Sequence, residues 1–168
     1  MPEYFDIVDS MDRVTRQATR EAAHREGLWH RAIHVLLFNQ QGEVFLQKRS
    51  MLKDTAPGCW DSSCSGHVDA GESYRTSAIR ELGEELGLNP APPIWPVFKT
   101  RACQETGWEF VWVYRGIANG PFTLHPEEIS AGRWIRPDIL DLEIEKNQDQ
   151  FAVSFCYLWK GFRAFLRG

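Results

Sequence analysis

The stretch of chain from residue 66 to residue 88 carries four glutamates among glycines and two arginines. It reads GHVDAGESYRTSAIRELGEELGL, in which Glu72 is followed by a group made of Glu81, Glu84 and Glu85. On a helix with about 100° between successive residues, Glu81 and Glu85 lie about 40° apart, and Glu84 lies about 60° to the other side of Glu81. The last three carboxylates can therefore face one point in space.

Three carboxylates on one face of a helix favour the binding of a cation. Like charges four residues apart destabilise a helix by roughly a few tenths of a kcal/mol, and a bound cation would offset their repulsion. Carboxylate oxygens are hard ligands that suit Mg²⁺ or Mn²⁺, and Mg²⁺ also binds the phosphate oxygens of substrates. The alternative is a solvated acidic helix face, but chance acidity would not also place the flanking glycines and Arg80. We therefore predict a divalent-metal site.

The residues around these carboxylates are suited to a supporting role. Arg80 follows Glu72 by eight residues, so one guanidinium could pair with that carboxylate and hold the loop against the helix. Gly66 and Gly71 bracket a loop in which a backbone carbonyl can approach a metal ion closely. Gly87 comes after the last residue of the predicted helix, which is typical of a helix C-cap.

At every specified position, this stretch resembles the signature of the Nudix hydrolases. The matching residues are Gly66, Glu72, Arg80, Glu81, Leu82, Glu84, Glu85, Gly87 and Leu88. The resemblance implies an α/β fold, namely an α/β/α sandwich with a mixed β-sheet between helices. It implies an enzyme that uses Mg²⁺ or Mn²⁺ to hydrolyse a nucleoside diphosphate linked to another group. It also implies that Glu81, Glu84 and Glu85 bind the metal, with the Gly66 carbonyl as a further ligand.

A second resemblance covers most of the chain, from residue 29 to residue 134. The segments WHRAIHVLLFN, LQKRSMLKDTAPGCWDSSCSGHVDAGES and EEISAGRW are similar to the branch of the superfamily that includes isopentenyl-diphosphate isomerases. In those isomerases histidines and glutamates form a metal site. The resemblance implies that the matching residues here are His30, His67 and Glu128.

This chain lacks one residue that the isomerase reaction requires. The catalytic cysteine of that family lies two residues before the matched histidine, where this chain has Ser65, with Cys64 one position earlier. A serine hydroxyl exchanges protons near neutral pH much less readily than a tuned thiol. Isomerases also depart from the full hydrolase signature, which this chain keeps. We therefore predict hydrolysis of a phosphoric anhydride, with an isomerase and a catalytically silent ligand sensor as the alternatives.

The five histidines have different candidate roles. His67 lies at the start of the motif and is either a metal ligand or phosphate contact, or a residue that packs in the loop. His30 begins a predicted strand, could meet His67 in space, and is a candidate for substrate binding. His34 lies inside the same strand and fits the core, whereas His24 and His125 fit the surface.

A general base and phosphate-binding cations can be sought outside the motif. Glu128 lies before the predicted last strand, where some Nudix enzymes supply a carboxylate as general base, and Glu127 is its rival. Lys48, Arg49 and Lys53 lie where a predicted hairpin leads into a loop, and they could bind the phosphates. Any one of these three could equally be a solvated surface cation.

The elements that would position these residues alternate between strands and helices. They are an N-terminal hairpin (5–8 and 14–18), a brief helix (21–25), a β-hairpin (32–38 and 43–48), a loop (49–61), the motif helix (73–86), strands at 95–102, 110–117 and 132–135, a helical turn at Pro137 and a C-terminal helix (151–166). We expect one domain over residues 1–168, with residues 1–28 as an N-terminal extension packed on it.

Length and composition agree with one enzyme domain. The chain has 168 residues with 43% hydrophobic content, enough for one substantial core. Its net charge of −4 does not indicate a binding surface for duplex nucleic acid. We therefore expect the substrate to be a small-molecule diphosphate, in the first place a nucleotide. No apolar run approaches about 18 residues and no signal-peptide pattern is present, so we expect no membrane partner and a cytoplasmic location. The four cysteines lack C-x-x-C spacing, so we expect them to be reduced thiols. The predicted C-terminal helix is rich in aromatic residues, which makes a homodimer a candidate.

Overall fold

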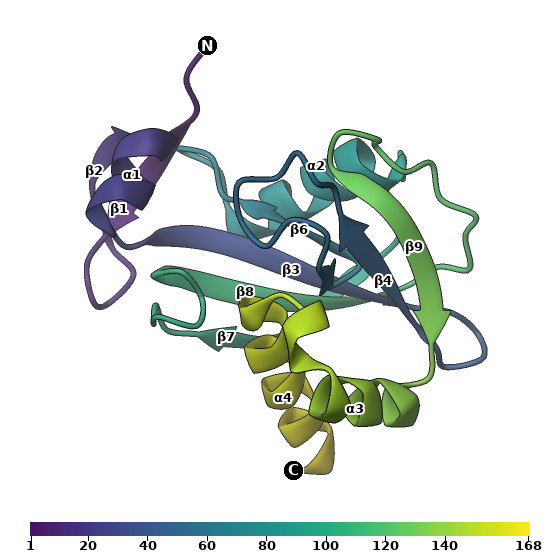
Figure 1. Ribbon diagram of the computed structural model, residues 1–168. Coiled ribbons are helices and arrows are strands. Elements are labelled where there is room, and N and C mark those ends of the chain that lie inside the picture. The colour runs from purple at the N-terminus through teal and green to yellow at the C-terminus, as the bar shows by residue number, and fades with distance from the viewer.

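The computed structural model describes all 168 residues, and Figure 1 shows a β-sheet between helices with a smaller unit at its N-terminal end. The strands are β1 (Tyr4–Val8), β2 (Val14–Thr19), β3 (His30–Phe38), β4 (Val44–Arg49), β5 (Trp60–Asp61), β6 (Cys64–His67), β7 (Ile94–Thr100), β8 (Glu109–Ile117) and β9 (Ile129–Ile135). The helices are α1 (Arg20–Glu26), α2 (Tyr74–Leu86), α3 (Pro137–Lys146) and α4 (Val153–Arg167), with a 3₁₀ turn at Gln148–Gln150.

The main sheet has β3 near its centre. The strand order is β5-β4-β3-β8-β7, while β6 also pairs with β3 and β9 also pairs with β4. β3 and β8 run parallel, with His30 opposite Glu109. The remaining pairs in this sheet are antiparallel, so the sheet is mixed as the sequence predicts.

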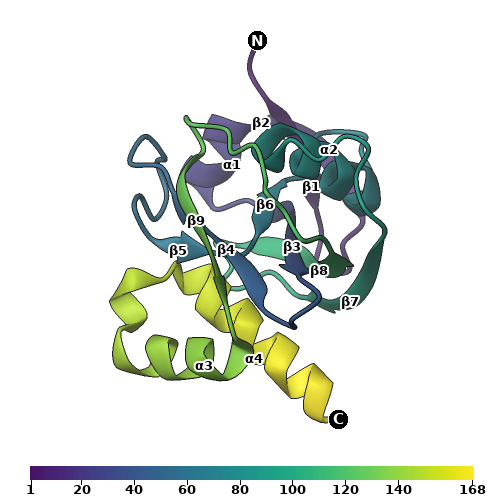
Figure 2. The same ribbon diagram turned by 90° about the vertical axis from the view of Figure 1, so that its right-hand side faces the viewer.

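Helices cover both faces of this sheet, as Figures 1 and 2 show from two directions. Successive residues of a strand point to opposite faces. In β3, Ile33, Val35 and Leu37 therefore join the buried cluster under α2, whereas Leu36 and Phe38 join the cluster under α3 and α4. These two clusters make the α/β/α sandwich, which confirms the predicted fold class.

The motif helix α2 begins and ends where the sequence predicts. The Ser73 hydroxyl caps its N-terminus by accepting a hydrogen bond from the Thr76 amide at 3.1 Å. Gly87 ends the helix in the left-handed region at φ 68°, and its amide donates to the Gly83 carbonyl. Because α2 packs directly on β6 and β3, these two caps also fix where its glutamates lie.

The predicted hairpin of residues 32–38 and 43–48 is only partly correct. β3 and β4 pair at Phe38 and Val44, beside the turn, and then diverge. The strand β6, which the sequence analysis does not predict, pairs with β3, and β9 pairs with β4. The serine and glycine of β6 have low strand propensity, and the strand forms because β3 supplies its pairing partner.

Other differences concern the lengths and ends of elements. The predicted loop 49–61 ends in the short strand β5, and β9 begins at Ile129 rather than at residue 132. α3 has ten residues where the sequence predicts one helical turn, with Pro137 in its first turn. In α4, Phe155, Trp159 and Phe162 are buried core residues. No helix in the molecule combines the length and the apolar character needed to cross a membrane.

Residues 1–28 form a compact unit at one end of β3, here called the N-terminal unit. The strands β1 and β2 pair antiparallel, α1 follows, and Phe5, Ile7 and Ala18 are buried between them. The Tyr4 carbonyl accepts a hydrogen bond from the Ala70 amide at 2.8 Å. This bond joins the N-terminal unit to the loop that precedes α2.

Candidate active site

Two glutamates of α2 lie against β6. Glu85 is only 5% exposed, and its Oε2 accepts hydrogen bonds from Gln47 Nε2 (3.0 Å) and from the Ser65 amide (3.2 Å). Glu81 lies so close to Gly66 that a Cβ on the glycine would come within 2.2 Å of the Glu81 carboxyl carbon. The missing side chain of Gly66 therefore leaves the space that the Glu81 carboxylate occupies. We call these two carboxyl groups the glutamate pair.

Both carboxyl groups of the glutamate pair lie in surroundings that disfavour their charged form. Burial raises the pKa of Glu81 to about 8, the charge of Glu85 adds to this effect, and Arg80 opposes it. Burial likewise raises the pKa of Glu85 to about 7, against the hydrogen bonds that this group accepts. A divalent cation would reverse this balance, because a nearby positive charge favours the charged form of both groups.

Binding of a divalent cation to the glutamate pair is expected to release protons. At neutral pH the metal-free protein holds a proton on Glu81 in most molecules and on Glu85 in a part of them, because their pKa values are about 8 and about 7. A cation must displace those protons, so we expect the affinity for Mn²⁺ to rise as the pH increases from about 6 to about 8.5. Titration by electron paramagnetic resonance measures this, and Glu81→Gln should flatten the dependence. An affinity independent of pH in the unmodified protein would contradict the prediction.

Arg80 connects the two ends of the motif. Its guanidinium donates to Glu72 (Nε to Oε1, 3.2 Å; Nη2 to Oε2, 3.1 Å) and to the His67 carbonyl (3.2 Å). The ion pair predicted from the sequence is thus present, and it ties the loop to α2. Arg80 Nη1 also donates to Glu81 at 2.7 Å and to Glu84 at 3.1 Å. The Glu84 side chain is 59% exposed, so it lies at the solvent rim, and its role as a metal ligand stays a prediction.

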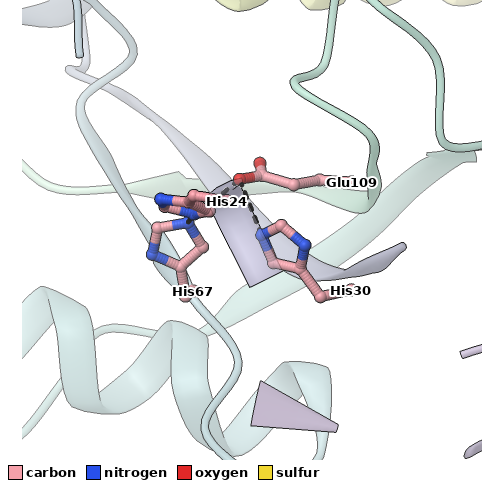
Figure 3. A group of neighbouring side chains, drawn as sticks. All are labelled: His24, His30, His67 and Glu109. Atoms are coloured by element: carbon pink, nitrogen blue, oxygen red, sulfur yellow. Dashed lines mark hydrogen bonds and ion pairs between the residues drawn. The ribbon is translucent and has the colours of Figure 1, made fainter. Parts of the chain in front are cut away.

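A second group of ligand-type side chains, here called the histidine–glutamate cluster, lies at the C-terminal end of β6. His24, His30, His67 and Glu109 come from α1, β3, β6 and β8, and Figure 3 shows their side chains together. Their ligand atoms all lie within 4.8 Å of one another. The Nε2 atoms of His24 and His67 are 3.2 Å apart. Glu109 Oε1 lies 3.0 Å from His67 Nε2 and 3.3 Å from His30 Nε2.

The surroundings of His30 direct its Nε2 into the cluster. Its Nδ1 lies 2.7 Å from the Leu28 carbonyl, which can only accept, so Nδ1 carries a proton, and in the neutral ring Nε2 offers its lone pair. That Nε2 is buried and makes no hydrogen bond, although the Glu109 carboxylate lies beside it. Phe5 stacks on the rings of His30 and His67, with centroid distances of 5.1 and 4.6 Å, and restricts their orientations.

The donor set of this cluster suits a borderline divalent cation. Three imidazoles and a carboxylate are ligands for Zn²⁺, Mn²⁺, Fe²⁺ or Co²⁺ in proteins. Burial lowers the pKa of His24, and the charges of His67 and His30 lower it further, which keeps that ring neutral. Burial by itself would raise the pKa of Glu109, but the charge of His67 and the close approach of the His30 and His67 rings hold it well below its ordinary range. The group is thereby kept as a carboxylate, the form that binds metal.

The cluster corrects the ligand set implied by the isomerase resemblance. His30 and His67 do meet, but the carboxylate beside them is Glu109 and not Glu128. His24, which the sequence analysis assigns to the surface, belongs to an exposed helix, yet its ring lies against His67. His30 and Glu109 are neighbours because the parallel strands β3 and β8 begin in register. No local sequence signal reveals that pairing.

Lys53 and Glu128, two of the residues singled out in the sequence, form an ion pair. The pair joins the loop after β4 to the loop before β9, where the Ser50 amide also donates to the Glu128 carbonyl at 2.9 Å. Their side chains are 21% and 36% exposed, so water and a substrate anion can reach both. Their roles in phosphate binding and proton transfer stay predictions.

The other two predicted phosphate-binding cations are engaged with different partners. The Arg49 guanidinium donates to Asp61 at 3.2 Å and to the Thr55 carbonyl at 2.9 Å. Lys48 lies over the ring of Trp60, with 5.7 Å between Nζ and the ring centre, on the face of the sheet that α3 and α4 cover. The strand register shifts between Lys48 and Arg49, so strand alternation does not decide how the two side chains lie, and their roles in phosphate binding stay predictions.

Cys64 does not replace the cysteine that isomerases use. Its side chain is fully buried and packs in the cluster under α2. Burial, followed by the charges of Glu85 and Glu81, raises the pKa of this thiol well above its ordinary value, so it stays protonated. Ser65, at the position of the missing cysteine, donates its amide to Glu85.

The sequence and fold are similar to those of known proteins. The family model described as NUDIX domain matches residues 28–155. An uncharacterized Nudix hydrolase of Pseudomonas aeruginosa is 37% identical over 146 residues, which cover 82% of this chain and 80% of that protein. An isopentenyl-diphosphate Delta-isomerase of Serratia proteamaculans is 31% identical over 163 residues, 95% of this chain and 91% of that protein. The crystal structure of DR0079 from Deinococcus radiodurans aligns with a TM-score of 0.83 and 27% identity, over 94% of this chain and 98% of that one.

Proposed function

This chain belongs to the Nudix hydrolase family, and we propose that it is a metal-dependent pyrophosphohydrolase acting on a nucleoside diphosphate or triphosphate, or on a related diphosphate. The observation that carries the proposal is the glutamate pair, buried beside Gly66 with raised pKa values. Two carboxyl groups are costly to bury side by side unless a cation or a proton compensates them. Family membership supports hydrolysis of a phosphoric anhydride as the reaction class.

Several residues of the motif would bind the divalent cation together. Glu81, Glu85 and the Gly66 carbonyl would hold Mg²⁺ or Mn²⁺, with Glu84 at the rim of the site. When bound, such a cation neutralises the diphosphate and lowers the pKa of a coordinated water. Glu85 is already oriented by its bonds from Gln47 and the Ser65 amide, so no rearrangement of its carboxylate is needed when the substrate arrives.

Proton transfer and charge compensation fall to the residues around the pair. Glu81 or Glu128 would accept the proton of the attacking water. The water oxygen bonds to phosphorus as the bond from phosphorus to the bridging oxygen breaks, and the leaving phosphate keeps that electron pair. Lys53, next to Glu128, would compensate the part of the substrate's negative charge that the cation does not neutralise.

The histidine–glutamate cluster would hold a second divalent cation. Its support is the unpaired, buried Nε2 of His30, aimed at the Glu109 carboxylate and at the other imidazoles. His67 of this cluster directly follows Gly66 along β6, and a substrate that contacts both cations would have to span the two sites. The nitrogen ligands favour a softer ion here than the all-oxygen ligands of the glutamate pair.

Co²⁺ added to the metal-free protein is expected to give the visible absorption of a cobalt ion with nitrogen ligands. His30→Ala should weaken Co²⁺ binding by more than about tenfold, because it removes a ligand whose orientation the Leu28 carbonyl fixes. His125→Ala is the matched control, since His125 is exposed and outside the cluster. Unchanged Co²⁺ affinity in His30→Ala would exclude the cluster as the site.

A panel of diphosphates tests the function as a whole. Nucleoside triphosphates, nucleoside diphosphates linked to other groups, and an isoprenoid diphosphate would be incubated with Mg²⁺ or Mn²⁺. We expect release of phosphate or pyrophosphate. Isomerisation is the second candidate, because the relative from Serratia proteamaculans is an isomerase and the cluster offers a histidine site. Double-bond migration without release would favour it, and neither product would indicate a ligand sensor.

A further inference from the structure

The turn between β1 and β2 carries a nearly buried carboxylate. The side chain of Asp12 is only 8% exposed, and its backbone is in the left-handed region at φ 59°. Its Oδ1 accepts a hydrogen bond from Arg31 Nε at 2.7 Å, and its Oδ2 accepts one from the Tyr74 hydroxyl at 2.8 Å. Lys99 forms an ion pair with the same Oδ2. A second nitrogen of the Arg31 guanidinium donates to the Asp12 carbonyl at 2.7 Å.

The three partners of Asp12 come from three separate elements of the main body. Arg31 lies in β3, Tyr74 is the first residue of α2 and Lys99 lies in β7. The two cations also lie over the Tyr74 ring, 5.4 and 5.1 Å from its centre. Removing one member of such a poorly exposed charge cluster leaves the other charges uncompensated, which makes this contact stronger than an exposed ion pair.

The N-terminal unit that this contact holds also supplies part of the histidine–glutamate cluster. His24 is on α1, and Phe5 of β1 is the ring that stacks on His30 and His67. The remaining ligands come from β3, β6 and β8 of the main body. Without the N-terminal unit in place, the cluster would therefore have two histidines and one carboxylate, with no aromatic support.

We propose that Asp12 is a positioning residue that seats the N-terminal unit on the main body and thereby brings His24 to the histidine–glutamate cluster. Arg31 directly follows the ligand His30 in β3, so the contact and the cluster share one rigid strand. The effect on cation binding rests on the second cation site of the proposed function, whereas the seating of the N-terminal unit does not.

Four proteins test the proposal: the unmodified chain, Asp12→Gly, His24→Ala and the double variant. Glycine suits the positive φ of residue 12, so Asp12→Gly removes the carboxylate without backbone strain. We expect each single variant to lose about tenfold in Co²⁺ affinity. We expect the double variant to bind Co²⁺ as weakly as His24→Ala and no weaker, because Asp12 acts through His24.

Hydrogen exchange of the metal-free proteins gives a second readout. Amides of β2 and α1 should exchange faster in Asp12→Gly than in the unmodified chain, because the N-terminal unit opens more often. Asp12→Asn keeps an oxygen that accepts from Arg31 but removes the charge that faces Arg31 and Lys99, so its exchange should be slower than that of Asp12→Gly and still faster than that of the unmodified chain. Tyr74→Phe keeps the ring and removes one hydrogen bond, and it should show a smaller increase even if Asp12→Gly fails to fold.

Each outcome has a defined meaning. Additive losses of Co²⁺ affinity in the double variant, or exchange in α1 unaffected by Asp12→Gly, would overturn the proposal. If the unmodified chain binds no Co²⁺, the second cation site of the proposed function fails, and the exchange of α1 alone decides whether Asp12 seats His24. Faster exchange there in Asp12→Gly, reduced in part by asparagine, would support the positioning role.

Discussion

Glu85→Gln is expected to reduce turnover of the diphosphate substrate by roughly two to four orders of magnitude. The substitution keeps the shape of the side chain, and its amide oxygen can still accept the hydrogen bond from the Ser65 amide. It removes the negative charge that a divalent cation requires at this position. The loss should therefore appear in turnover together with weaker Mn²⁺ binding, both measured by steady-state kinetics and titration.

The fold of Glu85→Gln should remain intact, and the pKa of Glu85 gives the reason. Burial raises this pKa from the ordinary 4.5 to about 7. A carboxyl group whose pKa is higher in the folded protein contributes stability at low pH, and that contribution is lost as the pH rises through the folded value. Near pH 8 the metal-free parent therefore holds an unfavourable charge that glutamine lacks. We expect the variant to melt at the same temperature or higher.

Glu145→Gln is the matched control for this experiment. Glu145 lies exposed on α3, away from β6, so its loss of charge should leave turnover unchanged. Near-normal turnover in Glu85→Gln, with Mn²⁺ affinity like that of the control, would remove the glutamate pair from the mechanism.

Gly66→Ala is expected to lower turnover by at least about two orders of magnitude without unfolding the protein. The new Cβ would lie within 2.2 Å of the Glu81 carboxyl carbon and Oε1. A flexible side-chain end can move away from such a contact at little cost in stability. The movement takes the Glu81 carboxylate out of the glutamate pair, so binding of Mn²⁺ should weaken while the melting temperature changes little.

Gly83→Ala is the control for the glycine substitution. Gly83 lies in the same helix, and a Cβ there would meet nothing closer than the Leu88 carbonyl oxygen at 3.9 Å. Alanine is the better helix former by about 1 kcal/mol, so this variant should be somewhat more stable and fully active. If Gly66→Ala retains the turnover and Mn²⁺ affinity of Gly83→Ala, the close approach of Glu81 to β6 has no part in the reaction.

The helical part of the site could be predicted from local sequence because a helix is held by bonds within its own segment. Its spacing of about 3.6 residues per turn brings Glu81 and Glu85 to neighbouring positions whatever the rest of the chain does. Ser73 and Gly87 mark its ends by capping chemistry, which is also local. The ion pair of Arg80 with Glu72 follows from the same short stretch.

The pairing of strands, unlike the helix, could not be predicted from a single short segment. The strand partner of a residue depends on a segment many residues away, and that choice is made by packing of the whole sheet. β6 was therefore not predicted, and the hairpin of β3 and β4 was predicted to be longer than it is.

The sequence by itself determined the carboxylate motif, because the motif depends on residue types at fixed spacing within one segment and on its flanking caps, and the resemblance of that motif to the Nudix signature implied the family and the fold class. Only the tertiary structure decided that Glu109 and His24 join His30 and His67, and that Glu84 stays at the rim. The physical reason is that a parallel strand pair and a docked N-terminal unit join residues distant in sequence. Such contacts are selected by the total burial and pairing of the folded chain, which no single segment encodes.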